Sequence, residues 1–182
     1  MAPEQDEYLS AYLFARGTTE SYLSYAHELA DSPRSGVHFV FPLVGAWDSL
    51  TVLEAAPNDL ETIRRRVIDL TSPLADGSRL HYSSVAFSFP PGGKIKKLDV
   101  PFPVETIVGF RTMAGASASL FVDLQAQLSR PNVEVLVERV NGAYDLVCEV
   151  SGQDWESSQG AVEELRAVVG DRAMIDVAFA AF

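Results

Sequence analysis

The sequence is poor in the residue types that most often bind metals or form covalent cross-links. It has one cysteine, Cys148, and three histidines among 182 residues. A single thiol can form neither an internal disulfide nor a cysteine-based zinc site. No two histidines have the spacing that places two metal ligands on one helix face. We therefore expect neither a metal nor a cofactor.

Positive charge is also scarce. The sequence has 14 basic and 25 acidic residues, which give a formal net charge of −11. DNA affinity comes largely from Lys and Arg, so we expect no direct nucleic-acid binding and no adhesion to an anionic membrane. No apolar run approaches the roughly 20 residues of a membrane span. Residues 1–7 lack the pattern of a signal peptide. The sequence predicts a cytoplasmic protein.

Familiar catalytic motifs are missing as well. The nearest approach to a Gly-x-Ser-x-Gly elbow, at residues 115–119, lacks its second glycine. The Gly-Gly-Lys at 92–94 continues into isoleucine rather than the Ser or Thr of a phosphate-binding loop. These absences favour a protein that is not an enzyme.

An internal repeat is the main feature that the sequence does contain. Gly-Ala-Trp-Asp at 45–48 recurs as Gly-Ala-Tyr-Asp at 142–145, which is 97 positions later (142 less 45). Asp-Leu-Glu at 59–61 recurs as Asp-Trp-Glu at 154–156, and Val-Ala-Phe at 85–87 recurs at 177–179. Three matches in the same order indicate a duplicated structural unit.

Hydrophobic periodicity gives both copies the same order of elements: strand, helix, strand, strand, helix, strand. The first copy predicts strands at 8–16, 37–43, 50–53 and 80–89, with helices capped by Thr18 or Thr19 and by Asp59. The second copy predicts strands at 105–113, 133–140, 144–150 and 173–182, with helices through 120–128 and from Asp154. Asn141-Gly142 predicts a tight hairpin turn.

This order predicts an α+β fold of two tandem ferredoxin-like βαββαβ units, of the dimeric α/β-barrel type, with antiparallel sheets and helices on one face. We place the first unit at 1–90, a Pro/Gly/Lys linker at 91–103 and the second unit at 104–182. The open face of each sheet must be buried. We expect Phe87 and Phe179 to drive that pairing, in an intramolecular pseudo-dimer or a homo-oligomer.

The second copy resembles the ligand-binding domain of the Lrp/AsnC transcription regulators. The matching stretch is Val-Asn-Gly-Ala-Tyr-Asp-Leu-Val at 140–147, followed by the helix cap Asp154. The resemblance covers most of 105–182 and extends by duplication to the first copy. Members of this family bind small effectors, commonly amino acids, near this hairpin. They usually carry an N-terminal helix-turn-helix, for which residues 1–7 are too short.

The resemblance implies an effector-binding regulatory protein that takes a small amino-acid-like molecule and does not itself bind DNA. The implied ligand-binding residues are Gly142, Tyr144 and Asp145, with their counterparts Gly45, Trp47 and Asp48. Asp145 could accept hydrogen bonds from a ligand ammonium, and Tyr144 could form an apolar wall with a polar tip. In the alternative interpretation the aspartates bond their own turns and the aromatic residues are packing residues.

Two other functions stay open. One is a ferredoxin-like barrel enzyme, a small isomerase or a cofactor-free monooxygenase, in which His38 or His81 acts as base. Both histidines fall on predicted strands that lie at opposite edges of one unit, so they are not expected to act together. The other is an assembly or regulatory partner that pairs with a full-length regulator.

Overall fold

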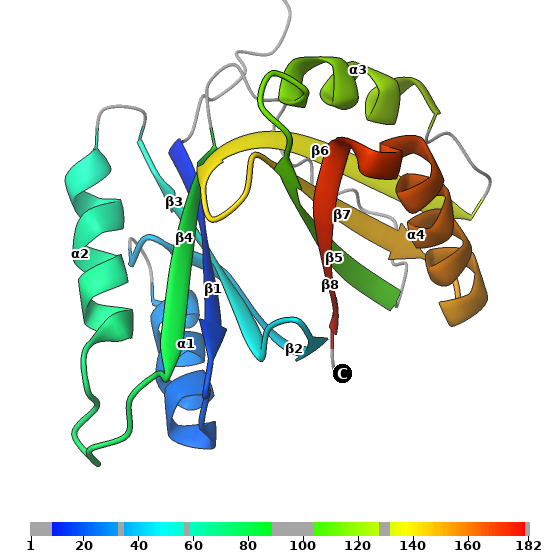
Figure 1. Cartoon of the computed structure of the whole chain (residues 1–182). Helices are drawn as coiled ribbons and strands as arrows, with labels where there is room; N and C mark the ends of the chain where they lie inside the picture. Colours follow the sequence, from blue (N-terminus) through cyan, green and yellow to red (C-terminus); the bar gives the residue numbers. More distant parts are fainter. Residues whose placement is uncertain (1–8, 33–34, 57–58, 89–103, 128–131, 181–182) are drawn as a thin grey trace, which may run out of the picture.

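Each half of the chain folds as strand, helix, strand, strand, helix, strand. The computed structural model describes residues 9–32, 35–56, 59–88, 104–127 and 132–180 (Figure 1). The first unit consists of β1 (Leu9–Arg16), α1 (Glu20–Asp31), β2 (Val37–Gly45), β3 (Ser49–Ala55), α2 (Leu60–Thr71) and β4 (Tyr82–Ser88). The second unit consists of β5 (Val104–Thr112), α3 (Ser117–Gln127), β6 (Val133–Gly142), β7 (Leu146–Gly152), α4 (Trp155–Val169), a 3₁₀ turn (Gly170–Arg172) and β8 (Ala173–Ala180). The predicted linker at 91–103 lies outside the described residues.

Three of the helices begin where a polar side chain caps them. Thr19 accepts a hydrogen bond from the backbone of Tyr22, as expected of an N-cap residue. Asp59 and Asp154 do the same for α2 and α4, each three residues before the bonded amide. Each cap satisfies an amide that the first turn of a helix leaves unpaired. The predicted helix starts are confirmed at these positions.

The eight strands close into one barrel with the order β1-β3-β2-β8-β5-β7-β6-β4. Within each unit the last strand pairs with the first, and the units join where β2 meets β8 and β4 meets β6. All neighbours are antiparallel, so β1, β2, β5 and β6 run in the same direction. The four helices lie outside the barrel, in two pairs (Figure 1). The predicted α+β fold is confirmed.

The open faces of the two sheets pack against each other inside the barrel, as expected, but not through the side chains that the sequence suggested. The sheets join edge to edge, and the aromatic side chains proposed for the interface lie on the outer, helix side. Phe87 packs in the core under the first unit's helices, and the ring of Phe179 lies 4.6 Å from that of Trp155 on α4. The expectation for Phe87 and Phe179 is therefore wrong. Successive side chains of a strand point to opposite faces, and the alanine that precedes each phenylalanine is the residue that faces the inside of the barrel.

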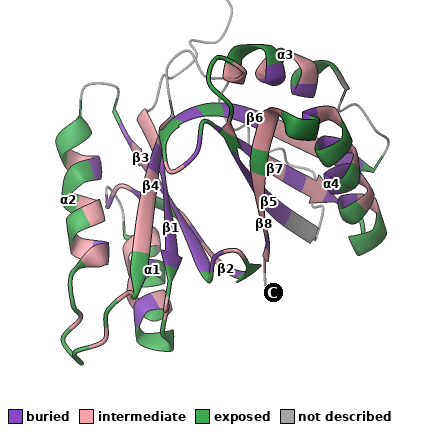
Figure 2. Cartoon of the chain, in the orientation of Figure 1, coloured by how far each residue is buried: buried purple, intermediate pink, exposed green. Residues whose placement is uncertain are grey.

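Three hydrophobic cores hold this arrangement. In Figure 2 the buried residues follow the strands and the helix faces that look toward them. One core lies under the helices of each unit, and the third fills the barrel. Fully buried side chains include Leu13, Leu53 and Ile63 in the first unit, Leu120, Leu146 and Leu165 in the second, and Phe14 and Leu50 inside the barrel.

The barrel closes through two glycines that stand in equivalent places. Gly45 has φ of 134° and Gly142 has φ of 131°, in the region that favours glycine. A Cβ on Gly45 would lie 2.6 Å from the carbonyl oxygen of Val177, and one on Gly142 would lie closer still to that of Val85. The next amide in each hairpin donates to that same oxygen at 3.1 Å. Each hairpin therefore touches the last strand of the other unit backbone to backbone.

This contact corrects the predicted position of the hairpin turn. Asn141 and Gly142 belong to β6, where Asn141 pairs with Phe87 of β4. The turn falls at 143–145 instead. Glycine is needed at 142 because the neighbouring strand approaches closely there, and not because the chain turns at that residue.

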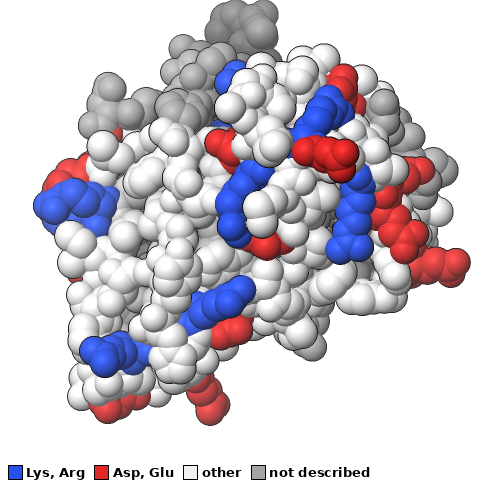
Figure 3. Space-filling model, viewed as in Figure 1, with Lys and Arg blue, Asp and Glu red and all other residues white. Residues whose placement is uncertain are grey.

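The described residues contain no helix that is both long and apolar enough to cross a bilayer. On the face that Figure 3 shows, basic side chains lie beside acidic ones rather than in one patch. The ion pairs of the described residues agree with this pattern, as between Arg111 and Asp176 and between Arg172 and Asp123.

Replacing Gly142 by alanine tests the closure. We expect Gly142→Ala to lower the free energy of unfolding by about 3 kcal/mol or more, from left-handed strain of roughly 1 kcal/mol and a backbone clash. Gly115→Ala is the control, because Gly115 also has positive φ (81°) but open space around it. Urea unfolding measures both variants. Equal losses of about 1 kcal/mol in the two variants would show that closure does not depend on this approach.

Candidate functional site

The sequence-predicted site residues meet at one end of the barrel, which we call the hairpin end. There Trp47 Nε1 donates a hydrogen bond of 2.6 Å to the hydroxyl of Tyr144. Both side chains are buried, and the ring of Phe14 contacts both of them. The two hairpins thus bring the repeated motif into one cluster. Because these aromatic residues fill the barrel end, their contacts are those of packing residues.

The two aspartates of the motif bond to the ends of neighbouring strands. Asp48 accepts from the backbone amide of Gly17 at 2.6 Å. Asp145 accepts from the amide of Thr112 at 2.7 Å and from its hydroxyl at 3.0 Å. These bonds are equivalent in the two units and tie each hairpin to its own first strand. The ligand-binding role of the six motif residues stays a prediction.

A short polar chain extends this cluster toward solvent. The hydroxyl of Tyr144 donates to Asp176 at 2.9 Å, and Asp176 forms an ion pair with Arg111. Arg111 also lies over the Tyr144 ring, 5.4 Å from its centroid, in a cation–π contact. Burial, together with the acceptor Asp176, raises the pKa of Tyr144 to about 12. Tyr144 is thus held as a neutral phenol.

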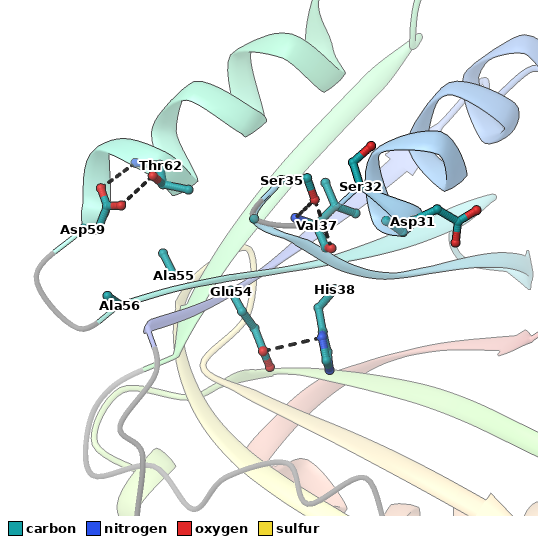
Figure 4. Close-up of a pocket in the computed structure, with 12 residues that line it drawn as sticks. Asp31, Ser32, Ser35, Val37, His38, Glu54, Ala55, Ala56, Asp59 and Thr62 are labelled. Atoms are coloured by element: carbon teal, nitrogen blue, oxygen red, sulfur yellow. Dashed lines mark hydrogen bonds and ion pairs between the residues drawn. The ribbon is translucent and has the colours of Figure 1, made fainter.

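The opposite end of the first unit contains a cavity of about 590 Å³. It opens between the end of α1, the start of β2, the end of β3 and the start of α2. Its polar lining includes Asp31, Ser35, His38, Glu54, Asp59 and Thr62. In Figure 4, Asp59 and Thr62 bond to each other on the helix side, while His38 and Glu54 face each other from neighbouring strands.

His38 and Glu54 form the one described ion pair in which a histidine takes part. The Nδ1 atom of His38 lies 3.6 Å from Oε2 of Glu54, with His38 exposed to solvent and Glu54 half-buried. The pairing of β2 with β3 shifts register between Val37 and Phe39, so His38 sits in an irregularity of the strand. The imidazole packs edge-on against Phe39, with ring centroids 4.0 Å apart. A carboxylate at Nδ1 favours the tautomer that leaves Nε2 as a base.

The other histidines are elsewhere. His81 is exposed just before β4, where its amide donates to Arg16 and its ring packs against Gly17. That position belongs to the hairpin end, so His38 and His81 do not share a site. His27 lies exposed on α1. The prediction that the two strand histidines act separately agrees with this geometry.

The barrel interior holds polar residues that the sequence analysis missed. Tyr12 donates a hydrogen bond to Glu138, which is only 5% exposed, and Glu149 lines the same small interior space. Burial is the main cause that raises the pKa of Tyr12 well above its usual range, followed by the charge of Glu138. The feature of the sequence that could have revealed these polar residues is the presence of glutamates within the otherwise apolar strand runs at 133–140 and 146–150.

In the second unit, the start of α4 packs on β5 through a buried pair of hydroxyl groups. The hydroxyls of Thr106 and Ser158 bond to each other at 2.8 Å, and both residues are fully buried. Gly152 lies so near Ser158 that a Cβ on it would sit 2.9 Å from that side chain. The two units therefore share the contacts of their hairpin ends, and the described residues that line the cavity all belong to the first unit.

Comparison with known proteins found likeness in structure only. No protein-family model matches the sequence, and no curated protein matches it significantly. A mutant chlorite dismutase from Candidatus Nitrospira defluvii matches with a TM-score of 0.61 at 11% identity, over 96% of this chain and 92% of that one. Another mutant of that enzyme, in complex with cyanide, has a TM-score of 0.62 at 10% identity, over 98% and 92%. A haem-binding protein from Thermus thermophilus has a TM-score of 0.54 at 12% identity, over 96% and 91%. Likeness at such low identity shows the fold.

These matches contradict the predicted function. The expected amino-acid-binding regulatory protein of the Lrp/AsnC type is wrong, because the three matches given above, each over nearly the whole length, are two chlorite dismutase structures and a haem-binding protein. The prediction that the chain is not an enzyme is contradicted by the same matches, since a dismutase is an enzyme. The error has a physical reason: the Gly-x-Tyr-Asp motif closes the barrel, and a fold can host many functions.

The described lining of the cavity beside His38 does not fit haem. Haem iron is held by a histidine, thiolate, methionine or tyrosine ligand. Cys148 offers no open thiolate, because it is fully buried in the second unit's core, where burial raises the pKa of its thiol. The cavity beside His38 has carboxylates and no Lys or Arg among its described lining residues to bind haem propionates.

Titration with hemin tests this conclusion. We expect no saturable change in haem absorption at one equivalent, because the described lining of the cavity beside His38 includes no Lys or Arg that could bind haem propionates. His38→Ala is the matched control and should behave as the unchanged protein does. A saturable spectrum that disappears in His38→Ala would show that the cavity holds haem after all.

Alkaline titration tests the environment of Tyr144. In the unchanged protein we expect one phenol to ionise at about pH 12, and Tyr144→Phe should lack that step. Because the folded pKa lies above the usual value of 10.0, the contribution of Tyr144 to stability is intact below about pH 10 and is lost as the pH rises toward 12. Phenolate absorbance gives the measurement. If Tyr144→Phe instead loses a step near pH 10, the buried hydrogen-bonded phenol is contradicted.

Proposed function

We propose that this chain is an enzyme that transfers a proton on a small polar substrate, with His38 as the base. The observation that carries the proposal is the His38–Glu54 pair, which lies in a cavity of about 590 Å³. Cavities that bind small molecules span roughly 300–1,000 Å³. The matched structures support an enzyme by analogy of fold.

The proposed roles follow from the geometry of the pair. Glu54 orients the imidazole through Nδ1, so that Nε2 accepts a proton from substrate in the cavity. The distance of 3.6 Å between Nδ1 and Oε2 is longer than a hydrogen bond, and such contacts often tighten when substrate binds. Glu54 also stabilises the imidazolium that forms. The reaction class is that of a small isomerase, and no step involves haem.

The rest of the cavity suits a polar substrate rather than an apolar one. Ser35 and Thr62 bring hydroxyls to the lining, and Asp31 adds a carboxylate near the end of α1. Apolar lining comes from small residues such as Ala55. All described lining residues belong to the first unit. The proposal therefore assigns the chemistry to residues 1–90 and the closure of the barrel to both units.

Deuterium exchange tests the proposal without a known substrate. A panel of small hydroxy-ketones and oxo acids is incubated with the protein in D₂O, and loss of the proton next to the carbonyl is followed by NMR. We expect faster exchange of at least one compound than in buffer. Because general base catalysis contributes roughly 10²–10⁴-fold, His38→Gln should slow that exchange by about 100-fold or more. Glu54→Gln should slow it less.

His81→Gln is the matched control, because His81 lies at the hairpin end and leaves the cavity unchanged. It should retain full exchange activity. Equal rates for His38→Gln and the unchanged protein would remove His38 as the base. A panel without any accelerated compound would count against proton transfer as the reaction.

A further inference from the structure

The two units carry equivalent arginines at the hairpin end of the barrel. Arg16 ends β1, and Arg111 lies one residue before the end of β5. Each guanidinium lies over the aromatic residue of its own unit's repeated motif. The guanidinium of Arg16 is 5.3 Å from the ring centroid of Trp47, and that of Arg111 is 5.4 Å from the ring centroid of Tyr144. The duplication thus produces two matching cation–π pairs.

The two arginines differ in what neutralises their charge. Arg111 forms an ion pair with Asp176 of β8. The residue two before each arginine pairs with Asp176 in the second unit and with Ser84 in the first, so serine takes the place of the carboxylate. Asp48, the acid of the first hairpin, accepts instead from a backbone amide. Among the residues that the structure describes, no carboxylate forms an ion pair with Arg16.

The guanidinium of Arg16 is nevertheless held in one orientation. Its Nε atom donates a hydrogen bond of 2.7 Å to the backbone carbonyl of Ala46, and its plane contacts the buried indole of Trp47. The side chain is exposed, and its two terminal nitrogens form no hydrogen bond within the described residues. Two neighbouring N–H groups of a guanidinium bind the two oxygens of a carboxylate. Arg16 therefore presents an oriented and unoccupied binding group for an anion.

An exposed aromatic ring stands next to this group. Tyr82 of β4 pairs directly with Arg16, and side chains that face each other in this way have Cβ atoms roughly 4.5–5.5 Å apart. The ring of Tyr82 stacks on Trp47, with centroids 5.7 Å apart and planes at 18°, yet Tyr82 is 57% exposed. In the second unit the residue that pairs with Arg111 is Met174, which has no ring. The arginine without a carboxylate is thus also the one with an aromatic neighbour.

We propose that Arg16 and Tyr82 bind a small aromatic carboxylate at the hairpin end. The terminal nitrogens of Arg16 donate to the carboxylate, and the ring of the ligand stacks on the open part of the Tyr82 ring. Trp47 contacts both side chains and holds them in position. The second unit has no such site, because Asp176 already neutralises its arginine. The site is separate from the cavity beside His38, and it does not depend on the proposed proton transfer.

Titration with benzoate tests the proposal. The indole N–H of Trp47 gives one of only two tryptophan side-chain signals in a proton–nitrogen NMR spectrum. We expect that signal to shift saturably. Benzamide has the ring without the charge, and it should bind about tenfold more weakly or worse, because a hydrogen bond to a charged group contributes about 1.5–3 kcal/mol. Cyclohexanecarboxylate has the charge without the aromatic ring, and it should bind about threefold more weakly or worse.

Three variants assign the binding to Arg16. Arg16→Gln should lower the affinity for benzoate about tenfold or more. Arg111→Gln is the matched control and should leave the affinity unchanged, because that arginine is already paired. Ser84→Asp gives the first unit the carboxylate that the second unit has, so it should also lower the affinity about tenfold or more.

The proposal is overturned if benzoate does not shift the Trp47 signal, or if Arg16→Gln binds it as tightly as the unchanged protein does. Equal affinities for benzoate and cyclohexanecarboxylate would contradict the role of Tyr82. If Ser84→Asp does not fold, the comparison of Arg16→Gln with Arg111→Gln still decides whether Arg16 binds the anion.

Discussion

Closure of the barrel depends on the backbone contact that each hairpin makes with the last strand of the other unit. A four-stranded sheet leaves two edges with unpaired backbone groups, which tend to recruit other strands. Gly45 and Gly142 allow the carbonyls of Val177 and Val85 to approach where a side chain would block them. The repeated Gly-Ala-aromatic-Asp and Val-Ala-Phe motifs are the two sides of this contact. Their recurrence follows from a reciprocal joint between like units.

Closing the barrel occupies its hairpin end, which leaves the opposite end for the proposed chemistry. At the hairpin end, Trp47 and Tyr144 fill the space between the units and Asp48 bonds to a strand end. The opposite end takes no part in the contact between the hairpins and the last strands, so the two units can differ there. The first unit has His38 and Glu54 beside a cavity, and the described lining residues of that cavity all belong to this unit. The proposed function is therefore assigned to the end of the first unit that takes no part in closing the barrel.

The order of elements, the duplication and the capped helix starts could all be predicted from the sequence, because periodicity and capping are local properties. The site could be predicted only in part. Gly142 carried a strong turn signal, but its conformation serves a strand 57 positions away (142 less 85), which no local pattern shows. His38 was a candidate on residue type alone. Its pairing with Glu54 depends on a register shift after Val37, and register irregularities leave no clear mark in a single sequence.

The barrel interior shows why duplication did not produce two equal halves. Glu138 and Glu149 stand 97 positions after Phe41 and Val52 (138 less 41, 149 less 52), so equivalent places hold carboxylates in one unit and apolar groups in the other. Two carboxylates per unit would place four like charges in one barrel, at a high desolvation cost. At these two positions the carboxylates come from the second unit, and Tyr12 of the first unit serves as hydrogen-bond donor to Glu138. Because of this asymmetry, Glu138 of the second unit meets a phenol donor from the first unit. The two units are therefore not interchangeable.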